Sequence, residues 1–259
     1  MKIFQSAGIF ILSSLATCAG LVERDVIYSQ NGVELEGFHV FDDSISGKRP
    51  AVLVIHQWTG LSDLEKERSR MLARLGYNVF AADIYGKGIR PQAPAAGAEA
   101  GKYKGDRSLF RARLDAGLAA LKKDERTDAE KIAAIGYCFG GTGGLEIARA
   151  GTALKGVVSF HGGLDAAAGM TAQPGKIPAK ILVLHGASDP YVPTAQVDAF
   201  QKEMTEAAAD WQMISYSGAV HSFTNKGAGN DPSKGAAYQE AADQRSWLAM
   251  QSFFAEIFQ

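Results

Sequence analysis

The chain has 259 residues, 46% of them hydrophobic, and a formal net charge of −1 from 27 basic and 28 acidic side chains. This length and apolar content suit one large folded domain or two small ones. The balanced charge excludes a whole surface built to attract nucleic acid or anionic lipid.

The first twenty residues differ in composition from the rest of the chain. Lys2 precedes an apolar stretch over residues 9–15, and small residues close the segment at 17–20. This layout is typical of a signal peptide, so we expect residues 1–20 to be removed and the protein to be periplasmic or secreted. The alternative is an ordinary amphipathic N-terminal helix, which would leave the protein in the cytoplasm.

The predicted strands come next in chain order. Residues 24–30 and 33–41 flank Asn31-Gly32, a dipeptide typical of a hairpin turn, and we expect them to form antiparallel edge strands. The later strand-like runs are mostly apolar along their whole length, as in strands covered on both faces. These runs are residues 51–57, 77–83, 131–137, 156–162, 180–186 and 211–216.

Helical patterns alternate with these strands, at residues 62–76, 108–123, 194–209 and 241–258. Ser62 and Glu65 have the spacing of a capping box at the start of the first helix. The alternation predicts a mostly parallel, doubly wound α/β sheet with helices on both faces, and residues 21–259 form a single domain. The segment 86–105, rich in Pro, Gly and Ala, predicts a long surface loop or lid.

Cys138 stands in "GYCFGG", residues 136–141, directly after a predicted buried strand. The pattern Gly136-x-Cys138-x-Gly140 has the spacing of a nucleophile elbow, with Cys in place of Ser. A helix that begins after it would place its positive end beside the sulfur and lower the thiol pKa. A small core cysteine is the structural alternative. With the leader removed, Cys138 would be the only cysteine of the chain.

Two further side chains complete a catalytic pattern. Asp189 lies in "ASDPYVP" after one predicted strand, and His221 lies in "SGAVHSF" after the next. The carboxyl ends of parallel strands meet at one edge of the sheet, so we expect Cys138, Asp189 and His221 to converge there. The order nucleophile, acid, histidine is the order of α/β-hydrolase triads.

These motifs, together with "AVLVIHQWTGL" and "AADIYG", resemble the dienelactone hydrolase family, cysteine-nucleophile members of the α/β-hydrolase superfamily. The resemblance runs from about residue 25 to 258. It implies the α/β-hydrolase fold, a Cys138–Asp189–His221 triad, and an oxyanion hole from the backbone N–H groups of Trp58 and Phe139.

The sequence departs from the family at two places. Gln57 stands where members usually carry Glu, and its amide could donate to the sulfur and stabilise a thiolate. The family's founding activity uses two arginines to bind a substrate carboxylate. At one of these positions this chain has Asn225. The other position is best matched by Lys87, and Arg90 lies nearby in the sequence. Dienelactone itself is therefore a doubtful substrate. We expect the substrate pocket to include Gln57, Tyr85, Lys87, Arg90, His161 and Phe223.

We predict a hydrolase that cleaves a small carboxylic ester or lactone through an acyl-cysteine. It would need no cofactor, bind no nucleic acid or membrane apart from the export signal, and exist as a monomer or small homo-oligomer. His56, His161 and His185 end predicted strands, but their spacing matches no metal motif, so no metal site is predicted. The alternatives are a non-catalytic binding protein with this fold, suggested by Gln57, and a cysteine thioesterase or acyltransferase.

Overall fold

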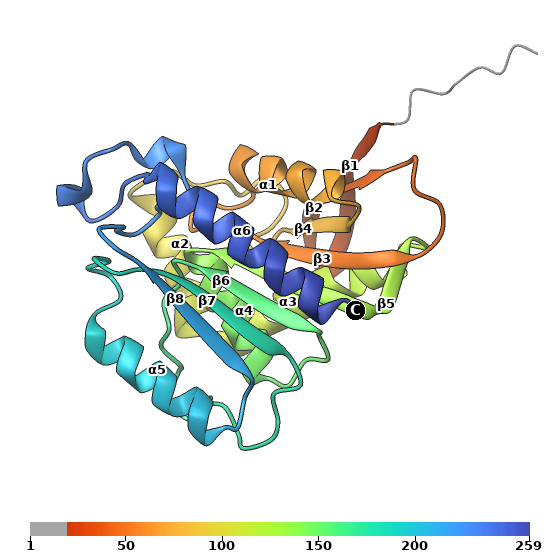
Figure 1. The fold of residues 1–259 in the computed structure, drawn as a ribbon. Coiled ribbons are helices and arrows are strands. Elements are labelled where there is room, and N and C mark those ends of the chain that lie inside the picture. Colours follow the sequence, from red (N-terminus) through yellow and green to blue (C-terminus); the bar gives the residue numbers. More distant parts are fainter. Residues whose placement is uncertain (1–19) are drawn as a thin grey trace, which may run out of the picture.

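The computed structural model describes residues 20–259 (Figure 1). The predicted leader, residues 1–20, therefore lies outside the described residues except for Gly20. The described part opens with the predicted hairpin, strands β1 (Leu21–Gln30) and β2 (Val33–Asp42). Asn31 and Gly32 form its turn with φ of 47° and 77°, the left-handed values that such a turn requires.

The eight strands form one sheet in the order β1-β2-β4-β3-β5-β6-β7-β8, parallel from β4 to β8. Only β1 of the hairpin is an edge strand. The expectation that β2 is one as well is wrong, because β2 pairs with β4 and buries Leu35, Phe38 and Val40. The remaining strands are β3 (Arg49–Ile55), β4 (Asn78–Ala82), β5 (Thr127–Tyr137), β6 (Gly156–Phe160), β7 (Lys180–Gly186) and β8 (Trp211–Tyr216).

Helices cover both faces of the sheet, as predicted (Figure 1). Strand β3 shows why: Leu53 and Ile55 pack into the core under α2, α3, α4 and α5, whereas Val52 and Val54 pack into the core under α1 and α6. The helices are α1 (Asp63–Arg74), α2 (Ala95–Gly105), α3 (Arg107–Lys123), α4 (Phe139–Arg149), α5 (Thr194–Glu206) and α6 (Glu240–Ile257), with short 3₁₀ helices at Lys226–Ala228 and Pro232–Lys234.

Local signals explain several helix ends. The predicted capping box is present at α1, where the Glu65 carboxylate accepts from the backbone N–H and the hydroxyl of Ser62. Asp106 caps α3 by accepting from the N–H of Leu109 at 2.9 Å. The bonds from the N–H groups of Ser62 and Leu109 satisfy backbone donors at the helix starts that have no partner within the helix.

The segment 86–105 is not a loop throughout, because its second half is helix α2. Its alanines favour a helix despite three glycines, and Tyr103 anchors it by stacking on Tyr85 with ring centroids 5.3 Å apart. The helix lies over the carboxyl end of the parallel strands, where the predicted site residues converge. None of the helices within residues 20–259 is long and apolar enough to span a membrane.

Candidate active site

Cys138 occupies a tight turn between β5 and α4. Its φ of 55° and ψ of −115° are unfavourable for a residue with a side chain. Glycine is required on both sides: a Cβ on Gly136 would collide with the backbone of Gly140, and a Cβ on Gly140 would collide with the carbonyl of Ile55. The turn holds the sulfur at the positive end of α4, partly exposed to the pocket.

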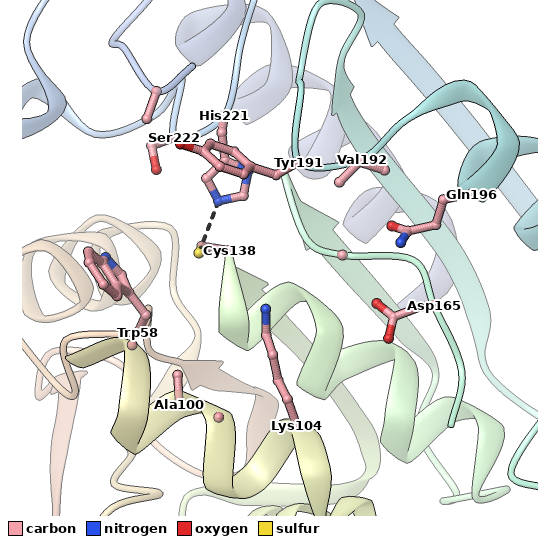
Figure 2. A pocket seen from close by; sticks show the side chains of 14 residues that line it. Trp58, Ala100, Lys104, Cys138, Asp165, Tyr191, Val192, Gln196, His221 and Ser222 are labelled. Carbon is pink, nitrogen blue, oxygen red and sulfur yellow. Dashed lines mark hydrogen bonds between the residues drawn. The ribbon is translucent and has the colours of Figure 1, made fainter. Parts of the chain in front are cut away.

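His221 and Asp189 complete a continuous chain of contacts with the sulfur. The Nε2 atom of His221 lies 3.0 Å from Cys138 Sγ, and its Nδ1 lies 2.8 Å from Asp189 Oδ2 (Figure 2). The second oxygen of the buried Asp189 carboxylate accepts from the N–H of Tyr191 at 2.9 Å, which fixes the carboxylate. The loops after β5, β7 and β8 thus bring the three predicted residues together.

The two reactive groups shift each other's pKa in opposite directions. Burial raises the pKa of the Cys138 thiol, but the hydrogen bond and charge of His221, with the Lys104 charge, outweigh burial and lower it. Burial disfavours the His221 cation, yet its bonds to Asp189 and Cys138 raise the His221 pKa to about 10. Both shifts favour the arrangement in which the proton lies on the imidazole, a thiolate–imidazolium pair.

Trp58 and Phe139, the residues predicted to supply the N–H groups of an oxyanion hole, both lie beside Cys138. Trp58 lines the same pocket as Cys138, and Phe139 directly follows the nucleophile as the first residue of α4. Within residues 20–259, neither group donates to a main-chain carbonyl. Two free N–H donors at a nucleophile are the components of an oxyanion hole.

Buried polar side chains fix the Trp58 loop. The Nδ1 atom of His56 lies 2.6 Å from the carbonyl of Gln57, and its Nε2 accepts from the N–H of Ile84 at 3.2 Å. These partners set one neutral tautomer, and burial lowers the His56 pKa to about 4. The hydroxyl of Tyr85 donates to the Trp58 carbonyl at 2.8 Å, and Glu65 accepts from the Gln57 N–H at 3.1 Å.

A cavity of about 410 Å³ opens above the sulfur (Figure 2). Its walls are mostly apolar or small, with a few polar groups, as is usual for sites that bind small molecules. The lining residues are Trp58, Gly97, Ala100, Gly101, Lys104, Cys138, Gly163, Asp165, Tyr191, Val192, Gln196, His221, Ser222 and Ala236.

Three residues that were expected to line the pocket lie outside it. Tyr85 is buried beneath the Trp58 loop. Lys87 points to the surface and pairs with Glu34 at 2.8 Å, because the loop after β4 is bonded back to β2. Arg90 donates to the carbonyl of Gly86 at 3.1 Å. None of the three lines the cavity, so their assignment to the substrate pocket is wrong.

The other three expected pocket residues are buried behind the site. His161 lies 2.8 Å from the Thr224 hydroxyl and packs edge-on against His221, with ring centroids 5.3 Å apart. Phe223 is fully buried against His161. Gln57 is 4% exposed, and its amide makes no hydrogen bond to the sulfur or to any other described residue. The expected contact between Gln57 and the thiolate is therefore absent.

Sequence patterns missed most of the cavity walls. Lys104, Gly97, Ala100 and Gly101 lie on α2, which the segment's Pro and Gly content concealed. Tyr191 lies within the Asp189 motif itself, and its exposed ring lies edge-on to the His221 ring, with ring centroids 5.3 Å apart. Among residues 20–259, no three His, Cys, Asp or Glu side chains gather as a metal site would require.

Comparison with known proteins agrees with this geometry. The model of the dienelactone hydrolase family matches residues 35–258. The structure of a dienelactone hydrolase-like promiscuous phosphotriesterase from metagenomic libraries is 40% identical, with a TM-score of 0.87 over 92% of this chain and 99% of that one. Another solved structure, called m3DLH, is 37% identical with the same TM-score and coverage.

A curated relative also shares much of the sequence. An uncharacterized protein from Caenorhabditis elegans, K02A2.1, is 39% identical over 154 residues, which are 56% of this chain and 92% of that protein. The family match extends from Leu35 in β2 to Phe258, the residue after α6, and includes the elbow cysteine and both partner loops. The chain belongs to the dienelactone hydrolase family and is a dienelactone hydrolase-like hydrolase with the α/β-hydrolase fold.

Proposed function

We propose that this hydrolase cleaves a small carboxylic ester or lactone through an acyl-cysteine on Cys138, with His221 as the acid and base and Asp189 as its orienting partner. One observation carries the proposal. The sulfur, the imidazole and the carboxylate form an unbroken chain with contacts of 3.0 and 2.8 Å. A cysteine that served only as a core residue would need neither contact.

The first half of the reaction forms the acyl-enzyme. The Cys138 thiolate attacks the carbonyl carbon, and the backbone N–H groups of Trp58 and Phe139 bind the resulting oxyanion. When the intermediate collapses, the bond from carbon to the leaving oxygen breaks. The His221 imidazolium gives that oxygen its proton, which leaves a thioester on Cys138 and a neutral imidazole.

The second half releases the acid and restores the resting pair. Neutral His221 takes a proton from water, whose oxygen attacks the thioester carbonyl. The carbon–sulfur bond then breaks, and Cys138 leaves as a thiolate while His221 remains protonated. Asp189 holds the imidazole in the tautomer that both halves need and supports its positive charge.

The test is a panel of short-chain 4-nitrophenyl esters combined with rapid quenching and intact-mass measurement. The wild-type protein should release nitrophenol and gain the mass of one acyl group, located on Cys138 by peptide mapping. The Cys138→Ala variant should lose both signals while keeping its fold. Ligand binding without turnover in the wild type would contradict the proposal and favour a binding protein.

The same experiment separates hydrolysis from acyl transfer. Added alcohol or thiol should change the product only if the acyl-cysteine reacts with acceptors other than water. Faster turnover of matched thioesters than of oxygen esters would favour a thioesterase.

A second candidate activity, hydrolysis of neutral phosphate triesters, is supported by the 40% identity to the promiscuous phosphotriesterase. A thiolate present before substrate binds could attack phosphorus as it attacks carbon. Paraoxon, a triester with the same nitrophenol leaving group, should then be cleaved by the wild type and not by Cys138→Ala. Absence of turnover in the wild type would exclude this candidate.

We also propose that residues 1–20 act as an export signal, supported by their charged, apolar and small-residue regions. The mature N-terminus should lie near Leu21 when the native protein is analysed by mass spectrometry. Recovery of the intact chain, beginning at Met1, from the cytoplasm would contradict export.

A further inference from the structure

His56 is buried directly after β3, between the two residues expected to supply the oxyanion hole. Its Nδ1 atom lies 2.6 Å from the carbonyl oxygen of Gln57, which precedes Trp58. Its ring stacks on that of Phe139, with ring centroids 5.8 Å apart. His56 has no exposed surface and does not line the cavity, so any part it plays in catalysis must pass through its neighbours.

The two partners of the imidazole decide which ring nitrogen carries the proton. The backbone N–H of Ile84 can only donate, so the Nε2 atom of His56, 3.2 Å away, is the acceptor. The Gln57 carbonyl can only accept, so Nδ1 carries the proton and donates it. Burial lowers the His56 pKa to about 4, and the ring therefore keeps this neutral tautomer at neutral pH.

The Gln57 carbonyl belongs to the same peptide group as the Trp58 N–H. This peptide bond is trans, and a trans peptide is planar, with its C=O and N–H pointing in opposite directions. The carbonyl is held by His56 and by the N–H of Gly60, at 3.2 Å, so the Trp58 N–H points away from both. In the described part of the chain this N–H donates to no main-chain carbonyl, and Trp58 lines the cavity with Cys138 (Figure 2).

We propose that His56 is a positioning residue of the oxyanion hole, which sets the direction of the Trp58 N–H by holding the carbonyl of the same peptide group. This inference rests on the proposed acyl-cysteine chemistry. The bond from Tyr85 acts differently, because the Trp58 carbonyl that it holds belongs to the next peptide group. A donor that is already aligned stabilises a developing oxyanion without reorganisation during the reaction.

Two substitutions separate the two ring nitrogens. The amide NH₂ of Asn lies near the position of Nδ1, so His56→Asn can still donate to the Gln57 carbonyl. The longer Gln places its amide near the position of Nε2, so His56→Gln can still accept from the Ile84 N–H but removes the side-chain donor from Gln57. Both variants remove the aromatic ring, which makes each the packing control for the other.

Two electrophiles that react at the same sulfur separate the oxyanion hole from the nucleophile. A 4-nitrophenyl ester acylates Cys138 through an oxyanion, whereas iodoacetamide alkylates it by direct displacement of iodide and forms none. Single-turnover release of nitrophenol should slow in His56→Gln by between about tenfold and a hundredfold, approaching the loss of one oxyanion donor. His56→Asn should recover most of that rate. The plateau rate of alkylation should equal that of the wild type in both variants.

His39→Gln is the matched control for the loss of a buried histidine. His39 lies on β2 and is 2% exposed. Its ring nitrogens are bonded to Arg24 and Asn78, neither of which lines the cavity. This variant should lose stability in urea unfolding and keep its acylation rate.

A measurement on the wild type does not depend on how the variants fold. Nitrogen NMR of protein labelled in its histidines should show His56 as the neutral tautomer protonated at Nδ1. A proton on Nε2, or on both ring nitrogens at neutral pH, would overturn the inference, because the Gln57 carbonyl would then not be held as described.

The contrary outcomes for the variants are distinguishable. Equal losses of acylation in His56→Asn and His56→Gln would assign the effect to packing, and unchanged rates in both would show that the Trp58 N–H is aligned without His56. Parallel losses of acylation and alkylation would place the defect at Cys138. Each of these results overturns the inference and leaves the proposed function standing. A wild type that forms no acyl-cysteine would refute the proposed function, and the inference with it.

Discussion

The hydroxyl of Tyr85, on the loop after β4, donates to the carbonyl of Trp58, on the loop after β3, at 2.8 Å. This bond joins two strand-end loops directly beneath the proposed oxyanion donors. The Tyr85 ring is 2% exposed and packs against His56 and Phe139. Tyr85 is therefore a positioning residue, which acts through the Trp58 backbone and does not touch substrate.

We expect Tyr85→Phe to lower kcat about tenfold and to change KM little. The Trp58 N–H would lose its fixed direction, and oxyanion stabilisation is needed in the transition state more than in the bound substrate. The loss should stay below the roughly hundredfold or larger effect of deleting an oxyanion donor. Steady-state kinetics on a 4-nitrophenyl ester measures both constants.

Tyr103→Phe is the matched control. The Tyr103 hydroxyl donates to the backbone carbonyl of Tyr85 at 3.3 Å, and its ring stacks on Tyr85, but it makes no bond to Trp58. Its kcat should remain near the wild-type value. Equal losses in both variants would mean that the stacked tyrosines act only through stability.

Asp189→Asn should reduce kcat by about 10³–10⁴, as expected when the imidazole loses the partner that sets its tautomer. The Asn side chain can still accept the N–H of Tyr191, so the loop should keep its shape. Asp198→Asn, on the exposed face of α5, is the control and should be fully active. A change under about threefold would assign Asp189 to loop structure alone.

The sequence was sufficient to predict the triad contacts because they depend on topology. Cys138, Asp189 and His221 each follow a parallel strand, and parallel strands align their carboxyl ends at one edge of the sheet. Apolar runs identify those strands without knowledge of their order. The glycines of the elbow add a local constraint, since the turn at Cys138 cannot form with larger residues at Gly136 or Gly140.

The pocket walls could not be predicted in the same way. Lys104 and Gln196 enter the cavity from helices, and their direction depends on how those helices pack, which no local pattern sets. Lys87 and Arg90 were inferred by position within a motif, yet the loop after β4 is bonded to β2 and turns them away from the cavity. Motif position locates a residue in the chain and leaves the direction of a long side chain undetermined.

The opposite pKa shifts of Cys138 and His221 predict how alkylation depends on pH. Because the thiol pKa is lowered and the thiolate is the reactive form, iodoacetamide should label Cys138 below the pH at which free cysteine, with a pKa of about 8.5, becomes reactive. The rate should stay on its plateau as the pH rises and fall only when the pH drops through the lowered value.

His221→Gln tests the origin of this shift. Burial alone raises the Cys138 pKa, so loss of the imidazolium should move the alkylation midpoint upward, to the free-cysteine value or beyond. A variant whose midpoint stays at the wild-type pH would show that the Lys104 charge and the α4 terminus suffice, and that His221 is neutral at rest.

Gln57 offers the final prediction, because the residue is 4% exposed and its amide makes no hydrogen bond to the sulfur or to another described residue. Gln57→Leu keeps roughly the same size and removes an amide that bonds to no other residue within 20–259, so stability should change little and the alkylation profile should not move. Gln57→Glu places a second carboxylate beside Glu65, whose pKa is already raised by burial. We expect it to destabilise the fold by about 2–4 kcal/mol at pH 8.

The direction in which stability changes with pH distinguishes the penalty of burying the new carboxylate from a simple steric misfit of the Glu side chain. A carboxyl whose pKa is raised in the folded state is penalised fully above that folded value, and the penalty disappears below the unfolded value of about 4.3. The stability gap between Gln57→Glu and Gln57→Leu, measured by urea unfolding, should therefore narrow as the pH falls from 8 to 5. If the difference in stability between the two variants did not depend on pH, the new carboxylate would be reaching solvent, and the side chain at position 57 would be accessible to water.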